Sequence, residues 1–195
     1  AVIEPVALAL HVMDFVEPKI GEIMAIFGQG PVGLVQTQVA KLCGMRIVAI
    51  EPDQKRLKLA KEFGADYIVN PGKENIKAFI SKVTDDLGAD CSVEAVGIQR
   101  TVDQAMEITK KGGKVVLVGA SKGLRGPPVR HEDIACYAVS DGGTRKYSIA
   151  LTLVSQGRVN VKKLITHEIS LKRLPSTMRL LAEGRLAAIK VIVKP

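Results

Sequence analysis

The sequence contains no tryptophan, and aromatic residues make up only 4% of it. Proteins that bind single-stranded nucleic acids stack the bases on aromatic side chains, so no such platform is indicated. The 28 lysines and arginines give a net charge of +8, but they occur as scattered pairs such as Lys110-Lys111 and Lys162-Lys163. We therefore expect no nucleic-acid partner and interpret the excess charge as a solvated surface, part of which faces a phosphorylated ligand.

Cysteine is also scarce. Cys43, Cys91 and Cys136 form no CxxC pair and no cluster with histidine, which excludes a zinc knuckle. We expect reduced, buried thiols in a cytoplasmic protein.

Long hydrophobic runs are absent. The longest, Ile23 to Phe27 and Val115 to Val118, are strand-sized, whereas a membrane-spanning helix needs about 20 apolar residues. No membrane segment is expected. The chain opens at Ala1 without a charged stretch leading into an apolar one, so we expect no signal peptide and interpret the chain as a piece of something longer.

Short apolar runs alternate with stretches whose apolar residues lie three or four apart. This pattern is typical of a parallel sheet covered by helices on both faces. The predicted strands are Ile23 to Phe27, Arg46 to Ile50, Tyr67 to Val69, Cys91 to Val93, Lys114 to Val118 and Ile134 to Val139. The predicted helices are Val32 to Leu42, Gln54 to Phe63, Asn75 to Thr84 and Thr101 to Thr109, each followed by a glycine. The fold class is α/β, a doubly wound six-stranded Rossmann sheet with strand order 3-2-1-4-5-6.

After Gly142-Gly143 the pattern changes to a helix at about 145–155, a strand at 164–169, a helix at 171–183 and a strand at 189–193. We expect a single domain over residues 1–195. Its core spans about 16–143, and 1–15 and 166–195 form edge segments.

A glycine-rich motif follows the first strand: Gly28-Gln29-Gly30-Pro31-Val32-Gly33. Gly28 permits a tight turn, Gly30 lets the backbone approach a pyrophosphate, and Gly33 allows close packing of helix on sheet. The phosphate charge then meets free amides at the positive end of the helix dipole. A Walker loop is excluded, because Leu34 and Val35 stand where a lysine and a hydroxyl are required.

The second strand ends at an acid, Glu51, which lies 23 residues after Gly28. A carboxylate there accepts hydrogen bonds from the adenosine ribose hydroxyls and repels a 2′-phosphate, which favours NAD over NADP. Arg56 weakens this preference, since a guanidinium nearby could accommodate the phosphate. Its alternative role is that of a charged residue on the solvent face of its helix.

These motifs are joined by others that resemble the medium-chain, zinc-type dehydrogenases, and within them the branch of sorbitol, threonine and related alcohol or polyol dehydrogenases. The resemblance covers nearly the whole chain. Its motifs are the opening Glu4-Pro5-Val6-Ala7-Leu8-Ala9-Leu10-His11, the segment 55–66, Gly88-Ala89-Asp90, Val93-Glu94-Ala95-Val96-Gly97, the segment 112–119 and the tail 188–195.

The resemblance implies that a substrate domain carrying most zinc ligands precedes a cofactor domain, and that this chain holds only the latter. Glu4 matches a family position at the catalytic zinc, but one carboxylate cannot hold the ion, which needs about three protein ligands. The family reaction passes hydride from an alcohol or polyol to NAD while zinc polarises the hydroxyl. We expect this chain alone to be inactive, and its catalytic residues stay unknown.

The same resemblance implies a set of cofactor contacts and an oligomer. Relatives pair their sixth strands edge to edge, which implies a homodimer or tetramer through 134–139. They place the nicotinamide near the ends of the later strands, and a basic tail residue reaches the pyrophosphate. The implied cofactor-binding residues are Gly28, Gly30, Pro31, Val32, Gly33, Glu51, Arg56, Val96, Gly97, Val118, Gly119 and Lys190, with the segment 140–143 close by.

Two other classes of protein share parts of the pattern. A nucleotide-sensing regulatory Rossmann module has the glycine loop and the acid but no reason for the Glu4-Pro5 opening or the tail. A methyltransferase that uses S-adenosylmethionine also places an acid after its second strand, but usually ends in an antiparallel strand. The substrate cannot be derived, because its pocket belongs mostly to the other domain.

Overall fold

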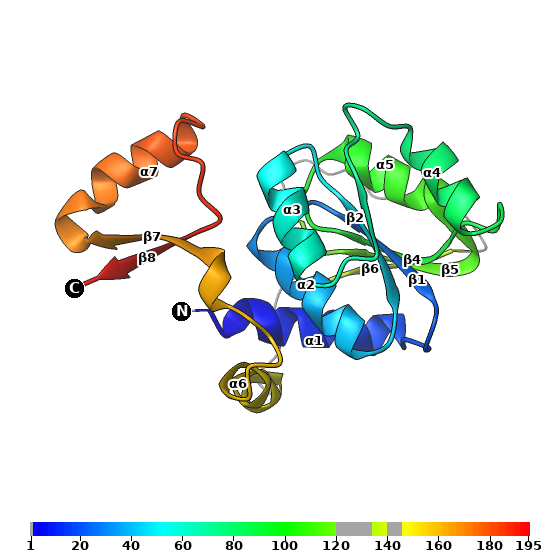
Figure 1. The fold of residues 1–195 in the computed structure, drawn as a ribbon, viewed down its shortest axis with the longest axis horizontal. Coiled ribbons are helices and arrows are strands. Elements are labelled where there is room, and N and C mark those ends of the chain that lie inside the picture. Colours follow the sequence, from blue (N-terminus) through cyan, green and yellow to red (C-terminus); the bar gives the residue numbers. More distant parts are fainter. Residues whose placement is uncertain (1, 120–133, 140–145) are drawn as a thin grey trace.

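The computed structural model describes residues 2–119, 134–139 and 146–195. Its main body is a six-stranded parallel sheet in the order β3-β2-β1-β4-β5-β6, as predicted from the sequence (Figure 1). The strands are β1 (Ile23–Phe27), β2 (Arg46–Ile50), β3 (Tyr67–Val69), β4 (Ala89–Glu94), β5 (Thr109–Leu117) and β6 (Ala135–Ala138).

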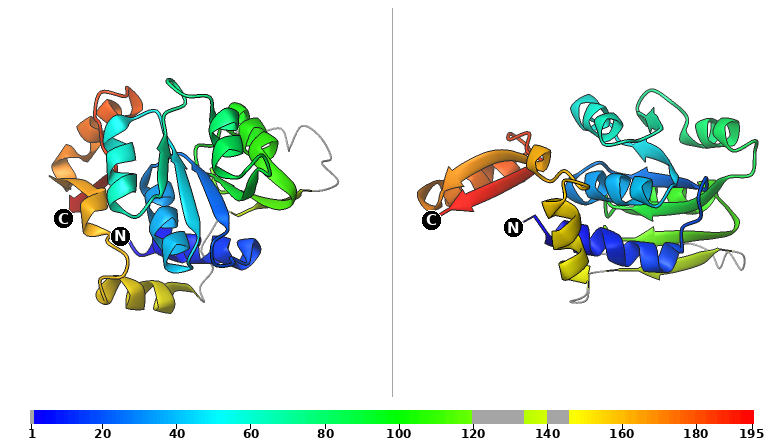
Figure 2. Two further views of the ribbon diagram at one scale, coloured as in Figure 1. Left: turned by 45° about the vertical axis from the view of Figure 1, so that its right-hand side comes forward. Right: turned by 60° about the horizontal axis from the view of Figure 1, so that its bottom comes forward.

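Helices cover both faces of this sheet, so the fold is doubly wound (Figure 2). Alternation along the strands explains why, since successive side chains point to opposite faces. In β1, Met24 and Ile26 pack against one layer and Ile23, Ala25 and Phe27 against the other. The first layer contains α1 (Glu4–Val16), α2 (Pro31–Leu42) and α6 (Tyr147–Ser155), and the second contains α4 (Ile76–Val83) and α5 (Gln99–Ile108).

The helices begin where short polar side chains or proline follow a strand. Asp53 caps α3 (Gln54–Glu62) by accepting from the amides of Lys55 and Arg56, and Asn75 caps α4 through the amide of Ala78. Such caps satisfy amides that lack an acceptor within the helix. Pro31 begins α2, where its missing N–H costs nothing.

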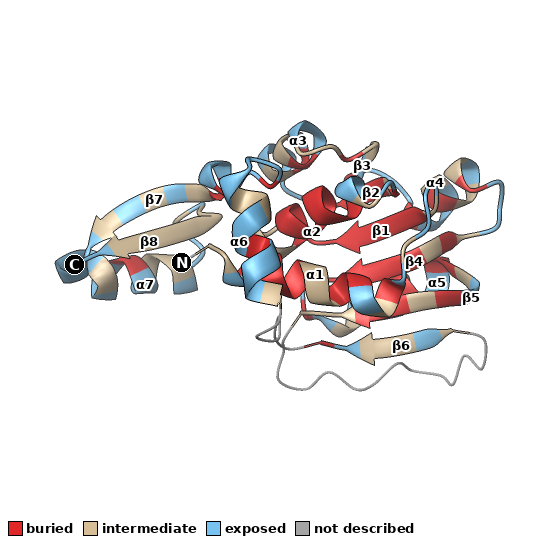
Figure 3. Cartoon of the chain, turned by 90° about the horizontal axis from the view of Figure 1, so that it is seen from below, coloured by how far each residue is buried: buried red, intermediate tan, exposed pale blue. Residues whose placement is uncertain are grey.

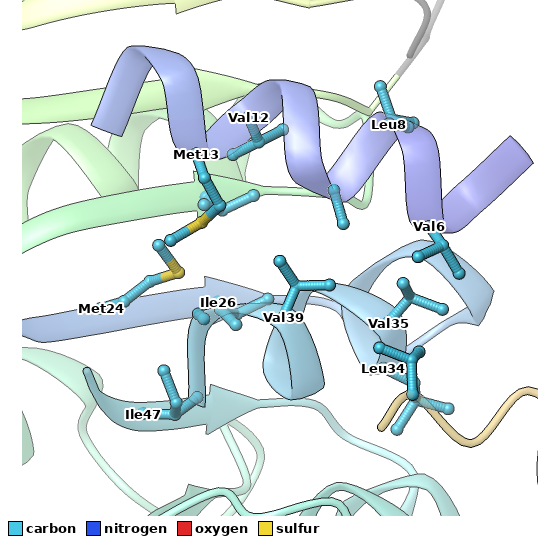
Figure 4. Packing of buried hydrophobic residues seen from close by; sticks show 14 of the residues in the cluster. Val6, Leu8, Val12, Met13, Met24, Ile26, Leu34, Val35, Val39 and Ile47 are labelled. Carbon is cyan, nitrogen blue, oxygen red and sulfur yellow. The ribbon is translucent and has the colours of Figure 1, made fainter. Parts of the chain in front are cut away.

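The first helix corrects one expectation. Residues 1–15 were expected to form an edge segment outside the core, but α1 is part of the core. Val6, Ala9 and Val12 are fully buried, and Figure 4 shows the side chains of α1 packed against α2 and β1. Because α1 belongs to no strand-helix repeat, the alternation used to predict the core could not include it.

Smaller differences concern β5 and its surroundings. The sequence predicts a helix that stops before Gly112 and a strand that begins at Lys114, but β5 begins at Thr109 and runs through Gly112. The pairing of β4 with β5 shifts register between Ala89 and Cys91 to accommodate the extra residues. Helix α5 also begins earlier than predicted, at Gln99.

All three thiols are free. Cys91 is buried, and Cys43 and Cys136 are half-buried. Burial raises the pKa of each thiol, so the reactive thiolate form is disfavoured at neutral pH.

The last 40 residues, 156–195, lie beyond α6 and are called the C-terminal unit below. They contain η2 (Lys162–Leu164), β7 (Ile165–Ser170), η3 (Leu171–Arg173), α7 (Leu174–Ala182) and β8 (Lys190–Lys194). Strands β7 and β8 pair in parallel as a separate sheet. Gln38 ties the unit to α2, since its side chain accepts from the amide of Asn160 and donates to the Asn160 carbonyl.

No helix within the described ranges is long and apolar enough to cross a membrane.

Candidate functional site

A cleft of about 640 Å³ opens at the carboxyl ends of the central strands. This is the edge where ligands bind in open α/β sheets, at the point where the strand order reverses between β1 and β4. Its walls come from the segments that follow β1, β2, β3 and β4. The lining residues are Phe27, Gly28, Gly30, Ile50, Glu51, Pro52, Arg56, Pro71, Gly72, Ile76, Ala95, Val96, Ile98, Arg100, Thr101 and Gln104.

Three glycines shape the corner between β1 and α2, each for a different reason. Gly28 has φ +84°, and a Cβ there would lie 2.7 Å from Val96 Cγ2. A Cβ at Gly33 would lie 1.8 Å from the carbonyl oxygen of Gly28, so the helix packs against the turn only without a side chain. A Cβ at Gly30 would meet no atom within 4 Å. Gly30 therefore keeps open the space in front of the helix.

The first turn of α2 presents amides to that space. Pro31, which has no N–H, is its first residue, and the amides of Val32 and Gly33 that follow have no acceptor within the helix. The amide of Leu34 is the first to bond back into the helix, to the Gly30 carbonyl at 2.9 Å. The corner can therefore donate hydrogen bonds to an anion, with the helix dipole adding to the attraction.

Glu51 stands at the end of β2 and is only 5% exposed. Its Oε2 accepts from the amide of Gln29 at 2.7 Å and its Oε1 from the amide of Asp53 at 3.1 Å. A carboxylate can accept about four hydrogen bonds, so capacity for two more donors is left. The carboxylate is thus fixed to the glycine corner, ready to accept from hydroxyl groups.

Arg56 extends this arrangement toward the C-terminal unit. Its guanidinium lies 4.0 Å from Glu51 Oε2, and its Nη2 donates to the carbonyl of Ala188 at 3.4 Å. The residue therefore lines the cleft and contacts the loop before β8.

Glu94, at the end of β4, is a buried carboxylate that holds the following turn in place by hydrogen bonds. It is fully buried, and its Oε1 accepts from the amides of Val96 and Gly97, both at 2.9 Å, and from the Thr101 hydroxyl at 2.7 Å. No described residue donates a hydrogen bond to its Oε2. The backbone carbonyl of Glu94 accepts from the amides of Val118 and Gly119 at 2.8 and 2.9 Å.

These contacts bring most of the predicted cofactor-binding residues together. Gly28, Gly30, Glu51, Arg56 and Val96 line the cleft. The remaining residues of the glycine corner form the adjacent turn of α2, and Gly97, Val118 and Gly119 meet through Glu94.

Two predicted residues from the ends of the chain, Lys190 and Glu4, do not line the cleft. Lys190 lies in β8, in the separate two-stranded sheet. Segment 140–143 lies outside the described residues. Glu4 is exposed at the start of α1, and the described residues contain no group of three or more His, Cys, Asp or Glu that could hold a metal ion.

The sequence reasoning missed several lining residues. Pro52, Pro71, Ile98 and Arg100 follow the ends of β2, β3 and β4, and Gln104 lies one turn further along α5. Their position after strand ends was a usable signal, since binding residues of this fold gather there. The apolar surfaces of Pro52, Pro71 and Ile98 suit a flat ring, next to the polar positions at Glu51 and the glycine corner.

A doubly wound parallel sheet with a glycine corner, a fixed carboxylate and a cleft between them defines a Rossmann-type domain. A family model described as zinc-binding dehydrogenase matches residues 31–140. The chain belongs to this family.

Named relatives agree with this assignment. An alcohol dehydrogenase of Cupriavidus necator is 30% identical over 91% of this chain and 50% of its own length, and a sorbitol dehydrogenase of Halalkalibacterium halodurans is 31% identical over 100% and 58%. A solved structure from Sinorhizobium meliloti, described as a zinc-binding dehydrogenase bound to NADP, superimposes with a TM-score of 0.88 at 27% identity, over 99% of this chain and 58% of that one. The chain thus spans little more than half the length of these relatives.

Proposed function

We propose that the cleft binds a nicotinamide dinucleotide, with NAD preferred over NADP, and that the chain is the cofactor-binding part of a dehydrogenase acting on alcohols or polyols. One observation carries the proposal: the Glu51 carboxylate accepts the amide of Gln29, inside the glycine corner, at 2.7 Å. An anion-binding helix turn and a hydroxyl-binding carboxylate are therefore held side by side, as a diphosphate and its adjoining ribose require.

The lining residues divide into three groups along such a ligand. The amides of Val32 and Gly33 would receive the diphosphate, with Gly30 giving it room. Glu51 would accept from the ribose hydroxyls, using the two acceptor positions that its backbone partners leave free. Pro52 and Ile98 would enclose the adenine ring. When bound, NAD supplies the acceptor for a hydride.

The preference for NAD follows from the fixed position of Glu51. A 2′-phosphate would meet a buried carboxylate of like charge, and the carboxylate cannot swing away without leaving two amides unpaired. Two observations favour NADP instead: a relative is bound to NADP, and the guanidinium of Arg56 lies close to Glu51. A substitution at Glu51 distinguishes a preference for NAD from a preference for NADP.

We expect Glu51→Ser to weaken NADH binding on the order of tenfold and to leave NADPH binding equal or stronger, because the repulsion is removed while Arg56 stays. Fluorescence titration with each cofactor measures the ratio. An unchanged preference in the variant would show that Glu51 does not select the cofactor.

The binding itself is tested by titrating the chain with NADH and following its fluorescence. We expect a saturable change that NAD competes away and that S-adenosylmethionine leaves unaffected. An unchanged signal at saturating cofactor would contradict the proposal, and so would a crystal that shows the dinucleotide elsewhere.

We further propose that turnover belongs to the longer protein, because the described residues do not form a zinc site. Zinc-dependent oxidation of an alcohol by the purified chain would overturn this.

From the family resemblance we also propose a cytoplasmic location and a homodimer or tetramer. The subunits would pair through β6, whose outer edge is free of strand pairing in the described sheet. Sedimentation that shows only monomer would exclude the oligomer.

A further inference from the structure

The positive charge of this chain is concentrated in the C-terminal unit. Residues 156–195 contain nine lysines and arginines but only two acids, Glu168 and Glu183, which gives a net charge of +7. The preceding 155 residues contain 19 basic and 18 acidic residues, a net charge of +1. Almost the whole excess of +8 therefore comes from one fifth of the chain.

Most of this charge is exposed and unpaired. Lys172, Arg173 and Arg179 are exposed and have no acidic partner in the part of the chain that the structure describes. Lys172, Arg179 and Arg185 surround a surface hollow of about 510 Å³, in which Glu183 is the one acid and pairs with Arg185 at 3.0 Å.

The unit lies on the side of the molecule where the cleft opens. Strands β1, β4 and β6 point toward it in Figure 3. The contact between Arg56 and the Ala188 carbonyl joins the cleft wall to the loop before β8. The opposite edge of the sheet, where the strands begin, lies farthest from it.

We propose that the C-terminal unit attracts the anionic dinucleotide toward the cleft and so speeds its association, without holding the bound ligand. The inference rests on the proposed function. A charged surface beside a binding site raises association rates by about 10-fold to 1,000-fold through its long-range field, and salt screens the effect. Charges distant from the bound ligand change the association rate and leave the dissociation rate unaffected.

The test is stopped-flow mixing of the full chain with NADH. Two variants reduce the charge in steps: Lys172→Gln with Arg179→Gln lowers the unit from +7 to +5, and Lys172→Glu with Arg179→Glu lowers it to +3. At about 10 mM salt, where the screening length is about 30 Å, we expect the second pair to slow association on the order of fivefold. The first pair should give an intermediate rate, and at about 1 M salt, where the screening length is about 3 Å, the differences should vanish.

A matched control makes the same change of net charge at the other edge. Lys19 precedes β1 and Lys82 lies near the end of α4, both exposed, and neither lines the cleft. Lys19→Glu with Lys82→Glu should slow association clearly less than Lys172→Glu with Arg179→Glu, because these charges lie where the strands begin and their field weakens with distance from the cleft.

Three results would overturn the inference. Association unchanged in Lys172→Glu with Arg179→Glu at low salt would show that the charge serves another partner. An equal slowing in the control pair would show an effect of net charge alone. A change confined to dissociation would mean direct contact. Absence of any NADH binding by the original chain would instead reject the proposed function, and the inference with it.

Discussion

At the scale of single residues, the glycine corner contains two neighbouring positions with opposite constraints. There is no room for a side chain at Gly33, because a Cβ would lie 1.8 Å from the Gly28 carbonyl oxygen. A Cβ at Gly30 would meet no other atom of the protein within 4 Å, and the φ of −74° and ψ of −169° of this residue are angles that any residue adopts. Gly33 is therefore required for the fold, whereas Gly30 is required only for binding of a ligand.

We expect Gly33→Ala to lower the free energy of unfolding by about 2 kcal/mol or more, since helix or turn must shift to relieve the overlap. Gly30→Ala should unfold at nearly the same urea concentration as the original chain but bind NADH on the order of tenfold more weakly, because its methyl group would occupy the space in front of the helix amides. Urea denaturation and fluorescence titration measure the two effects.

Each variant serves as the control for the other. If Gly30→Ala bound NADH normally, the phosphates would not pass in front of this residue. If Gly33→Ala unfolded at the original urea concentration, the close approach of Gly33 to Gly28 would be relieved at little cost.

Much of the cleft could be predicted from residue identity, but not all of it. The glycine spacing and the acid at Glu51 predicted two of its walls, because each has a fixed sequence relation to the first strand. Arg100 and Pro71 could not be found this way, since Arg100 reaches the cleft through the crossover that places β4 beside β1, and Pro71 through the pairing of β3 with β2. Lys190 was assigned by resemblance, and the structure places it in another sheet.

At the scale of secondary-structure elements, Glu94 connects β4 to the turn and helix that follow it. Removing its carboxylate would leave the amides of Val96 and Gly97 and the Thr101 hydroxyl without their acceptor. An unsatisfied buried donor costs about 1–3 kcal/mol. We therefore expect Glu94→Ala to lower the free energy of unfolding by about 3 kcal/mol or more, as measured by urea denaturation.

Glu94→Gln is the conservative comparison. It keeps one side-chain oxygen for the three donors and changes the oxygen that has no partner, so its loss of stability should be clearly smaller. Equal losses in both variants would show that the unpartnered oxygen matters as much as the bonded one.

A second carboxylate joins elements at the edge of the sheet opposite the cleft, where the strands begin. Asp66 accepts from Lys41 Nζ at 2.7 and 2.9 Å and from the amide of Ile47 at 2.7 Å, and so connects α2 and β2 to the start of β3. Burial acts to raise the pKa of Asp66, but these hydrogen bonds and the Lys41 charge outweigh it and hold the pKa below its usual value.

A lowered pKa in the folded state stabilises the fold above the unfolded value of about 3.9, and this contribution is lost as the pH falls through the folded pKa. We expect Asp66→Asn to be less stable than the original chain at pH 7 and the difference to shrink below about pH 4. Urea midpoints across this range measure it. Asp103→Asn, an exposed change on α5, is the control, and a pH-independent difference for Asp66→Asn would contradict the expectation.

The elements themselves were predicted best where strand and helix alternate. Strands β1 and β2 are almost wholly buried apolar runs, which the sequence pattern identifies directly. The long β5 was predicted too short, because Gly112 and Gly113 are typical of a stop and only pairing with β4 keeps them in the strand.

At the scale of the whole molecule, the two sheets differ in how they are stabilised. The main sheet has hydrophobic layers on both faces, whereas Thr177 is the one buried residue among 165–195, all of which the structure describes. Backbone hydrogen bonds without buried apolar surroundings open at low free-energy cost.

We therefore expect amide hydrogens of β7 and β8 to exchange with solvent at least about 100-fold faster than those of β1 and β4, because a difference of about 2.7 kcal/mol in opening free energy already gives this factor. Hydrogen exchange read by mass spectrometry measures it. Equal protection would mean that the C-terminal unit is covered by a partner, such as a second copy of the chain.

The buried position of α1 also bears on how the protein is made. Of the elements that share a core with α1, β1 and α2 follow it directly in the sequence. The contacts to α6, which include an ion pair between Asp14 and Lys146 at 2.6 Å, exist only after some 130 further residues have been added. During translation, the side of α1 that packs against α6 therefore lacks this cover until α6 has been made, and a nascent-chain chaperone would find its binding site there.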